Sequence, residues 1–101
     1  MIEICNLRNT KPTQPYDFKV DRSSPLGNPY YMQFEEQRNE VCDKYERWFY
    51  KQIETSIAFM CELSVLQTVY KQYGKLRLFC WCSPKRCHAE TIKKYIEENT
   101  K

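Results

Sequence analysis

The feature that most constrains the fold is an apolar run at residues 76–82, which leads directly into a helical pattern. The run reads Leu-Arg-Leu-Phe-Cys-Trp-Cys. Such a short and nearly continuous apolar segment is expected in a strand that is buried in the middle of a sheet. After it, Ala89, Ile92 and Ile96 recur at helical spacing and predict a last helix that ends near Asn99.

The preceding residues predict two more strands and two more helices. Residues 2–5 and 16–20 alternate between apolar and polar side chains, whereas residues 35–52 change to a helical period. Thr55 or Ser56 is expected to begin a second helix, and Gly74 stands where a left-handed residue would end it. The short junction predicts an antiparallel pair or one bent helix.

This order of elements predicts a single α/β domain over residues 1–101. Helices separate the second and third strands, so these two strands could pair in parallel through a right-handed crossover. We expect a small Rossmann-like fold of two or three layers, with a short, mostly parallel sheet and three helices.

Two features that the sequence lacks, a membrane-spanning run and a signal peptide, limit the class of protein that is expected. No apolar run approaches the ~20 residues that span a bilayer. The first residues, Met-Ile-Glu-Ile, lack the charged and apolar segments of a signal peptide. A cytoplasmic protein without a membrane partner is therefore expected, in which the six cysteines are thiols, metal ligands or core residues rather than a disulfide framework.

Charge is distributed unevenly along the chain. The net charge of +3 does not by itself predict nucleic-acid binding, but residues 71–94 hold seven basic residues and one acid, Glu90. Residues 35–46 hold five acids. Two solvated helix faces of opposite sign explain most of these residues. Lys85 and Arg86 differ, because they lie inside a dense motif.

That motif, Cys-Trp-Cys-Ser-Pro-Lys-Arg-Cys-His at residues 80–88, is the expected functional centre. Cys80 and Cys82 should point to one face of the strand. Cys87 and His88 should fall in the first turn of the last helix, whose N–H groups and partial positive charge attract anions. The same field should lower the pKa of Cys87.

Three interpretations of this motif remain open. Cys80 and Cys82 could be small core residues. Three cysteines and the only histidine could bind zinc, although adjacent ligands such as Cys87 and His88 rarely share one tetrahedral ion. Alternatively, Cys87 and His88 could contact or act on an organic ligand. For His88, a helix cap or a satisfied polar contact is a structural alternative.

The loop at residues 21–29 is the expected second wall of a pocket. Arg22 could bind a phosphate or carboxylate, Ser24 could donate its hydroxyl, and Asn28 could bind a base or amide edge. A surface ion pair for Arg22 and a purely structural turn at Gly27-Asn28-Pro29 are the alternatives.

Together, the two segments resemble the domain family DUF 4326, which is found in bacteria and phages. Its members show Arg-x-Ser-x-Trp-Gly-Asn-Pro and Cys-Trp-Cys-x-Pro-x-x-Cys-His, which match residues 22–29 and 80–88. Leu26 replaces the usual Trp, and Ala89-Glu90 replaces a Gly-Asp pair. The resemblance implies a compact α/β domain in which both motifs form one pocket, and it implies no particular reaction.

The expected function is binding of a nucleotide or a related phosphorylated small molecule, as in a phage protein that sequesters or modifies a host nucleotide signal. The candidate ligand-binding residues are Arg22, Ser24, Gly27, Asn28, Pro29, Cys82, Lys85 and Arg86. If the protein is an enzyme, Cys87 or Glu90 is the expected nucleophile or base and His88 the proton carrier. No cofactor and no metal are expected. The alternatives are a zinc-stabilised interaction module and a nucleic-acid binder that uses residues 71–94.

Overall fold

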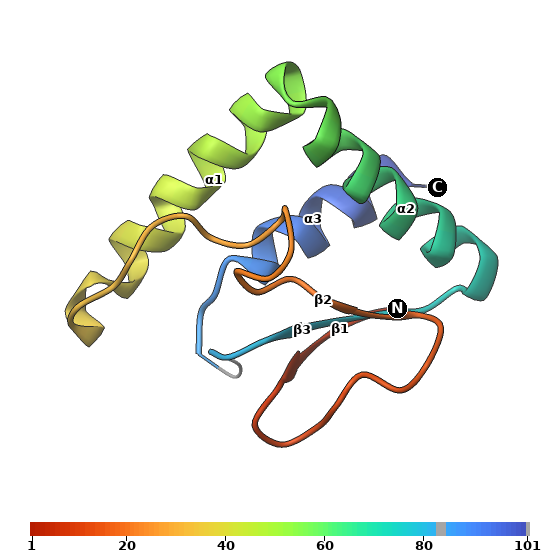
Figure 1. Cartoon of the computed structure of the whole chain (residues 1–101), viewed down its shortest axis with the longest axis horizontal. Coiled ribbons are helices and arrows are strands. Elements are labelled where there is room, and N and C mark those ends of the chain that lie inside the picture. Colours follow the sequence, from red (N-terminus) through yellow and green to blue (C-terminus); the bar gives the residue numbers. More distant parts are fainter. Residues whose placement is uncertain (83–84, 101) are drawn as a thin grey trace.

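The computed structural model of the chain describes residues 1–82 and 85–100 (Figure 1). In chain order, these residues form strands β1 (Ile2–Asn6) and β2 (Asp17–Lys19), the short 3-10 helix η1 (Glu35–Gln37), helices α1 (Arg38–Thr55) and α2 (Ile57–Tyr73), strand β3 (Leu76–Cys80) and helix α3 (Ala89–Asn99). The predicted order of strands and helices is confirmed, and the protein is a small α/β domain.

The three described strands form one parallel sheet in the order β1-β3-β2. β3 is central, as its apolar sequence predicts, and pairs Leu78 with Ile4 on one side and with Phe18 on the other. Figure 1 shows α1, α2 and α3 on one side of the sheet, while the loop at residues 7–16 lies on the other side. The domain therefore has the two-layer form of the predicted architecture.

Local signals set the ends of α2. The Ser56 side chain accepts the N–H of Phe59 (3.2 Å), and Gly74 ends the helix with φ 67°. Ser56 itself has an extended backbone between α1 and α2. The two helices therefore meet at an angle at this residue (Figure 1).

One apolar core lies between the helices and the sheet. Side chains with 0% exposure come from every layer: Val20, Tyr45, Phe49, Leu63, Leu66, Leu76, Leu78, Ile92 and Ile96. Leu26 joins them from the loop at residues 21–29, and the Tyr45 hydroxyl donates to its carbonyl (2.7 Å). This buried anchor fixes the loop above the end of the sheet.

The prediction that the last strand continues to Cys82 is wrong, because β3 ends at Cys80. Its neighbours end at Asn6, which pairs with Cys80, and at Lys19, which pairs with Phe79. Beyond Cys80 neither neighbour continues the ladder of backbone hydrogen bonds that would keep Trp81 and Cys82 extended. Trp81 and Cys82 therefore lie beyond the end of the sheet, although Cys82 still packs against the core.

No helix in residues 1–82 and 85–100 is long and apolar enough to cross a membrane.

Candidate functional site

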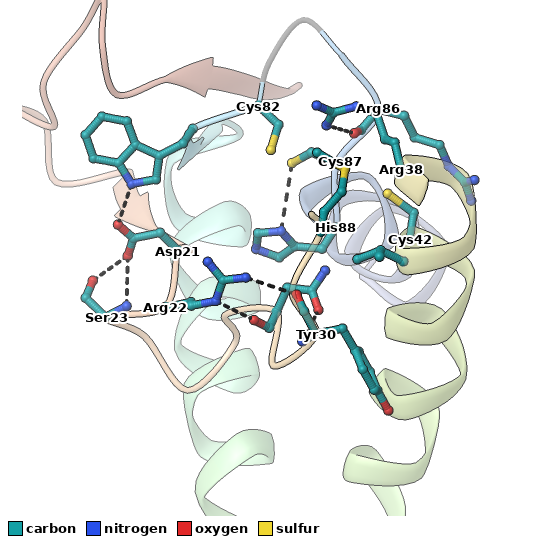
Figure 2. Close-up of a pocket in the computed structure, with 14 residues that line it drawn as sticks. Asp21, Arg22, Ser23, Tyr30, Arg38, Cys42, Cys82, Arg86, Cys87 and His88 are labelled. Carbon is teal, nitrogen blue, oxygen red and sulfur yellow. Dashed lines mark hydrogen bonds between the residues drawn. The ribbon is translucent and has the colours of Figure 1, made fainter. Parts of the chain in front are cut away.

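A cavity of about 220 Å³ lies where the loop after β2 faces the residues between β3 and α3 (Figure 2). α1 closes a third side. The lining residues are Asp21, Arg22, Ser23, Asn28, Tyr30, Met32, Arg38, Val41, Cys42, Trp81, Cys82, Arg86, Cys87 and His88. Two segments about 60 residues apart in the chain therefore meet at one site, beyond the carboxyl ends of parallel strands.

Arg22 holds its own loop in shape. Its Nε donates to the carbonyl of Asn28 (3.1 Å) and its Nη2 to the carbonyl of Tyr30 (3.0 Å). The guanidinium also lies over the ring of Tyr31, 4.2 Å from the centroid. Arg22 thus braces one wall of the cavity and places a positive charge on it.

Gly27 and Ser24 shape this loop from outside the cavity lining. A Cβ at Gly27 would lie 2.3 Å from the carbonyl oxygen of Asp21, so the backbone approach requires glycine. The Ser24 hydroxyl accepts the N–H of Leu26 (3.1 Å). Gly27 and Ser24 therefore determine the shape of the turn, as the structural alternative for this loop predicts for Gly27.

Asp21 connects the loop to the cysteine motif. Its carboxylate accepts the N–H of Ser23 (3.1 Å), the Ser23 hydroxyl and the indole N–H of Trp81 (3.1 Å). Burial acts to raise the pKa of Asp21, but these hydrogen bonds outweigh it and lower the pKa. Asp21 is therefore ionised at neutral pH and fixes the orientation of Trp81, whose exposed fraction is 54%.

His88 is buried and bonded to the end of β2. Its Nε2 lies within hydrogen-bond distance of the Val20 carbonyl, which can only accept, so Nε2 carries the proton. Nδ1 then faces the Cys87 sulfur at 4.0 Å. Burial is the largest influence on His88 and lowers its pKa, so the imidazole is neutral at pH 7.

Cys82 and Cys87 differ sharply in acidity. A hydrogen bond with Cys87 is the largest influence on Cys82, and together with the hydrogen bond and charge of Arg38 it lowers the Cys82 pKa to about 5. The pKa of Cys87 is raised by its hydrogen bonds with Cys80 and Cys82 and by burial. The expectation of a lowered pKa at Cys87 is therefore wrong: Cys87 lies behind the surface, and Cys82 is the thiolate.

Charged side chains of α1 and η1 meet the basic part of the motif. Arg38 donates to the carbonyl of Arg86 (2.9 Å) and pairs with Glu35 (2.8 Å). Arg86 pairs with Asp43 (2.8 Å), and Lys85 pairs with Glu35 (2.6 Å). The acidic and basic regions seen in the sequence thus face each other at this edge of the cavity.

The structure brings together only some of the candidate residues. Six of them line the cavity: Arg22, Asn28, Cys82, Arg86, Cys87 and His88. Five do not: Ser24, Gly27, Pro29, Lys85 and Glu90. Glu90 instead accepts the N–H of Cys87 (3.2 Å) at the start of α3. Ser83 and Pro84 of the motif lie outside the described residues.

Arg38 and Trp81 are the important lining residues that the sequence did not single out as ligand-binding. Arg38 gives no sequence signal, because it resembles any other charged residue of a helix. Trp81 does give one, since an aromatic residue between two motif cysteines points away from the face that they occupy. Leu26 does not line the cavity, because it is buried in the core.

In the part of the chain that the structure describes, no group of three or more Cys, His, Asp or Glu side chains is placed to hold a metal ion.

Comparison with known proteins identifies a family. Neither the curated proteins nor the solved structures gave a significant match. The family model described as "Domain of unknown function (DUF4326)" matches residues 5–98, which include both segments of the cavity. The chain therefore belongs to the DUF4326 family.

Proposed function

We propose that the cavity binds a nucleotide or a related phosphorylated small molecule in the cytoplasm. The observation that carries the proposal is the placement of three arginines, Arg22, Arg38 and Arg86, around a cavity that also has Trp81 on its wall. Guanidinium groups match phosphate oxygens in geometry and charge, and an indole face stacks on a nucleobase.

The arginines come from three separate segments. Arg22 follows β2, Arg38 begins α1 and Arg86 precedes α3. Each is held by protein groups, so little side-chain entropy remains to be lost on binding. Arg22 donates to its own loop through Nε and Nη2. Because both acceptors are neutral carbonyls, the charge of Arg22 stays available to an anion.

The apolar side of the cavity suits a planar group. Trp81 is held through its indole N–H by Asp21, while Met32 and Val41 supply aliphatic surface. Stacking of a base on an aromatic side chain contributes about 1–3 kcal/mol. The volume of about 220 Å³ is below the roughly 300–1,000 Å³ typical of drug-sized ligands. A mononucleotide or one half of a dinucleotide fits this size, with part of the ligand left in solvent.

A thermal-shift screen of the full chain against mononucleotides, dinucleotides, cyclic nucleotides and sugar phosphates tests the proposal. A ligand at a hundred times its Kd should stabilise the protein by about 2.7 kcal/mol. Arg38→Gln and Trp81→Leu should each abolish the stabilisation. Arg47→Gln, on an exposed residue of α1 outside the cavity, should retain it.

Each alternative function predicts a different result, which a separate measurement on the same protein would show. Binding of DNA or RNA that collapses with salt, without a response to free nucleotides, would replace the proposal with a nucleic-acid binder. Stoichiometric zinc that is lost together with the fold on chelation would favour the zinc-stabilised module. Recovery of the bound ligand intact or cleaved separates sequestration from catalysis.

A further inference from the structure

Three sulfurs gather where β3 runs toward α3. The Sγ atoms of Cys80 and Cys87 lie 3.0 Å apart, and the hydrogen bond between Cys82 and Cys87 brings the third sulfur into the group. Figure 2 shows the sulfurs of Cys82 and Cys87 pointing toward one another at the edge of the cavity. None of the six cysteines, all of which are described, forms a disulfide in this structure.

Of the three sulfur-bearing residues in this cluster, Cys82 is the most accessible to solvent. Cys82 is partly exposed and lines the cavity, whereas Cys80 and Cys87 have exposed fractions of 1% and 4%. A small reagent that enters the cavity therefore meets Cys82 first. Cys87 stands directly behind it and also reaches the cavity wall.

The two thiols also differ in the roles that their surroundings favour. Cys87 and then Arg38 donate hydrogen bonds to Cys82 and stabilise a negative charge on its sulfur, which makes Cys82 the stronger nucleophile at neutral pH. Hydrogen bonds with Cys80 and Cys82, together with burial, keep Cys87 protonated. A partly exposed thiolate next to a second, protected thiol is the arrangement of a reactive cysteine and its resolving partner.

We propose that Cys82 is a hydroperoxide-reactive cysteine and that Cys87 resolves its oxidised form into a reversible disulfide at the cavity wall. The thiolate of Cys82 attacks one oxygen of hydrogen peroxide, the O–O bond breaks, and the leaving hydroxide takes a proton to become water. Cys82 is then a sulfenic acid. The sulfur of Cys87 attacks the Cys82 sulfur, and the hydroxyl leaves with the Cys87 proton as a second water. Two thiols are oxidised by two electrons, and one peroxide is reduced to two waters.

This inference concerns the cavity of the proposed function but needs no bound nucleotide. A disulfide would remove the negative charge of Cys82 beside Arg38 and would tie Cys82 to Cys87, which precedes α3. Both changes alter the wall that a ligand would contact. Conversely, a ligand in the cavity should slow the oxidation, because it would cover Cys82.

The test is peroxide oxidation of the reduced full chain at neutral pH without any ligand, followed by thiol counting and tryptic mapping. Two of the six thiols should be lost and should return on treatment with a dithiol reductant. Cleavage at Arg77, Lys85, Arg86 and Lys93 separates residues 78–85 from residues 87–93, so the disulfide should join these two peptides. Fragment ions then show whether Cys80 or Cys82 is the partner.

Variants separate the two roles. Cys82→Ala should lose the disulfide. Cys87→Ser keeps a hydroxyl that can donate to Cys82 but has no sulfur to resolve it, so this variant should accumulate a sulfenic acid at Cys82 that a 1,3-dicarbonyl reagent traps. Cys61→Ala, which removes an exposed cysteine on α2, should behave like the unmodified chain. The mapping of the unmodified chain decides the question even if a variant does not fold.

Three outcomes would overturn the inference: a disulfide between Cys80 and Cys87, oxidation that falls first on Cys61, or stoichiometric zinc that protects Cys82 in the purified protein. Failure here would leave nucleotide binding untouched, because the screen for ligands measures thermal stability. A protein that forms the disulfide but binds no nucleotide would support this inference and contradict the proposed function.

Discussion

The Nε2 of His88 donates a hydrogen bond to the carbonyl of Val20, a residue 68 positions earlier in the chain. This bond joins the residue that precedes α3 to the residue that follows β2. The ring also meets Tyr45 of α1 edge to face, with centroids 5.0 Å apart. His88 therefore connects the three segments that contribute residues to the cavity wall, and it helps to set the shape of the cavity.

Replacing His88 should destabilise the protein, and the loss should be smaller when the new side chain keeps a hydrogen-bond donor for the Val20 carbonyl. His88→Ala leaves a buried carbonyl at Val20 without its partner, which costs about 1–3 kcal/mol, and also opens a void beside Tyr45. His88→Gln can place an amide N–H near the position of Nε2 and should lose less. Urea denaturation of both variants measures the difference. Equal losses would show that the hydrogen bond does not contribute.

The stability of the protein should fall as the solution is acidified below the normal pKa of histidine. Burial lowers the pKa of His88 below 6.5, so the unfolded chain takes up this proton before the folded chain does. The contribution of His88 is therefore fully present above pH 6.5 and is lost as the pH falls through the lowered pKa. The charged groups that act on the ring are Asp21, Arg22 and Cys82.

Urea denaturation between pH 7.5 and pH 4.5 measures this dependence. If the pKa of His88 differs by one pH unit between the folded and unfolded chain, the free energy of unfolding changes by about 1.4 kcal/mol. Cys82 adds a loss of the same sign that runs from its ordinary pKa of 9.0 down to about 5, so this loss spans most of the measured pH range. His88→Gln should remove the additional loss that begins below pH 6.5 and keep the steady loss that Cys82 causes between pH 7.5 and pH 5. A curve that His88→Gln leaves unchanged would contradict the assignment.

Gly27→Ala should cost more stability than Gly74→Ala, although both replace a glycine at a loop position. At Gly27 the new methyl would meet the backbone of Asp21 at 2.3 Å, so the loop must move, at about 1–3 kcal/mol. At Gly74 nothing lies within 4 Å, and only the left-handed backbone (φ 67°) opposes the change, at about 1 kcal/mol. Thermal denaturation compares the two. A smaller loss at Gly27 would mean that the loop adapts freely.

Features that depend on neighbouring residues were predictable from the sequence. Ser56 begins α2 and Gly74 ends it, each through a hydrogen bond within one turn, and both predicted roles are confirmed. Ala89, Ile92 and Ile96 are buried on one stripe of α3, as their spacing predicts. The position of β3 in the centre of the sheet followed from its apolar composition, since only a strand with two neighbours buries so many side chains.

Features set by distant contacts were not predictable. The end of β3 depends on where β1 and β2 stop, which the apolar run through Cys82 does not reveal. Likewise, the low pKa of Cys82 depends on Arg38, which lies 44 positions earlier at the start of another element. The helix field alone favoured Cys87, and the prediction failed because hydrogen bonds with Cys80 and Cys82, together with burial, outweigh that field.

The acidity of Cys82 should respond to three variants in a fixed order. The hydrogen bond with Cys87 is the largest cause of the lowered pKa and Arg38 follows it, so Cys87→Ala should raise the pKa most and Arg38→Gln less. Arg47→Gln, on the same helix but outside the cavity, should leave it at about 5. The measurement is the pH profile of iodoacetamide alkylation at Cys82, followed by peptide mapping.

A full profile is needed because a rise in the pKa of Cys82 has two opposing effects on the alkylation rate. At a pH below the pKa, a pKa that is higher by one lowers the thiolate fraction about tenfold. The remaining thiolate is more nucleophilic, which offsets roughly half of that change on a logarithmic scale. The midpoint of the profile reports the pKa without this compensation. If the midpoint for the unmodified chain lay near the ordinary value of 9.0, Arg38 and Cys87 would not activate Cys82, and the resolving role of Cys87 would lose its physical basis.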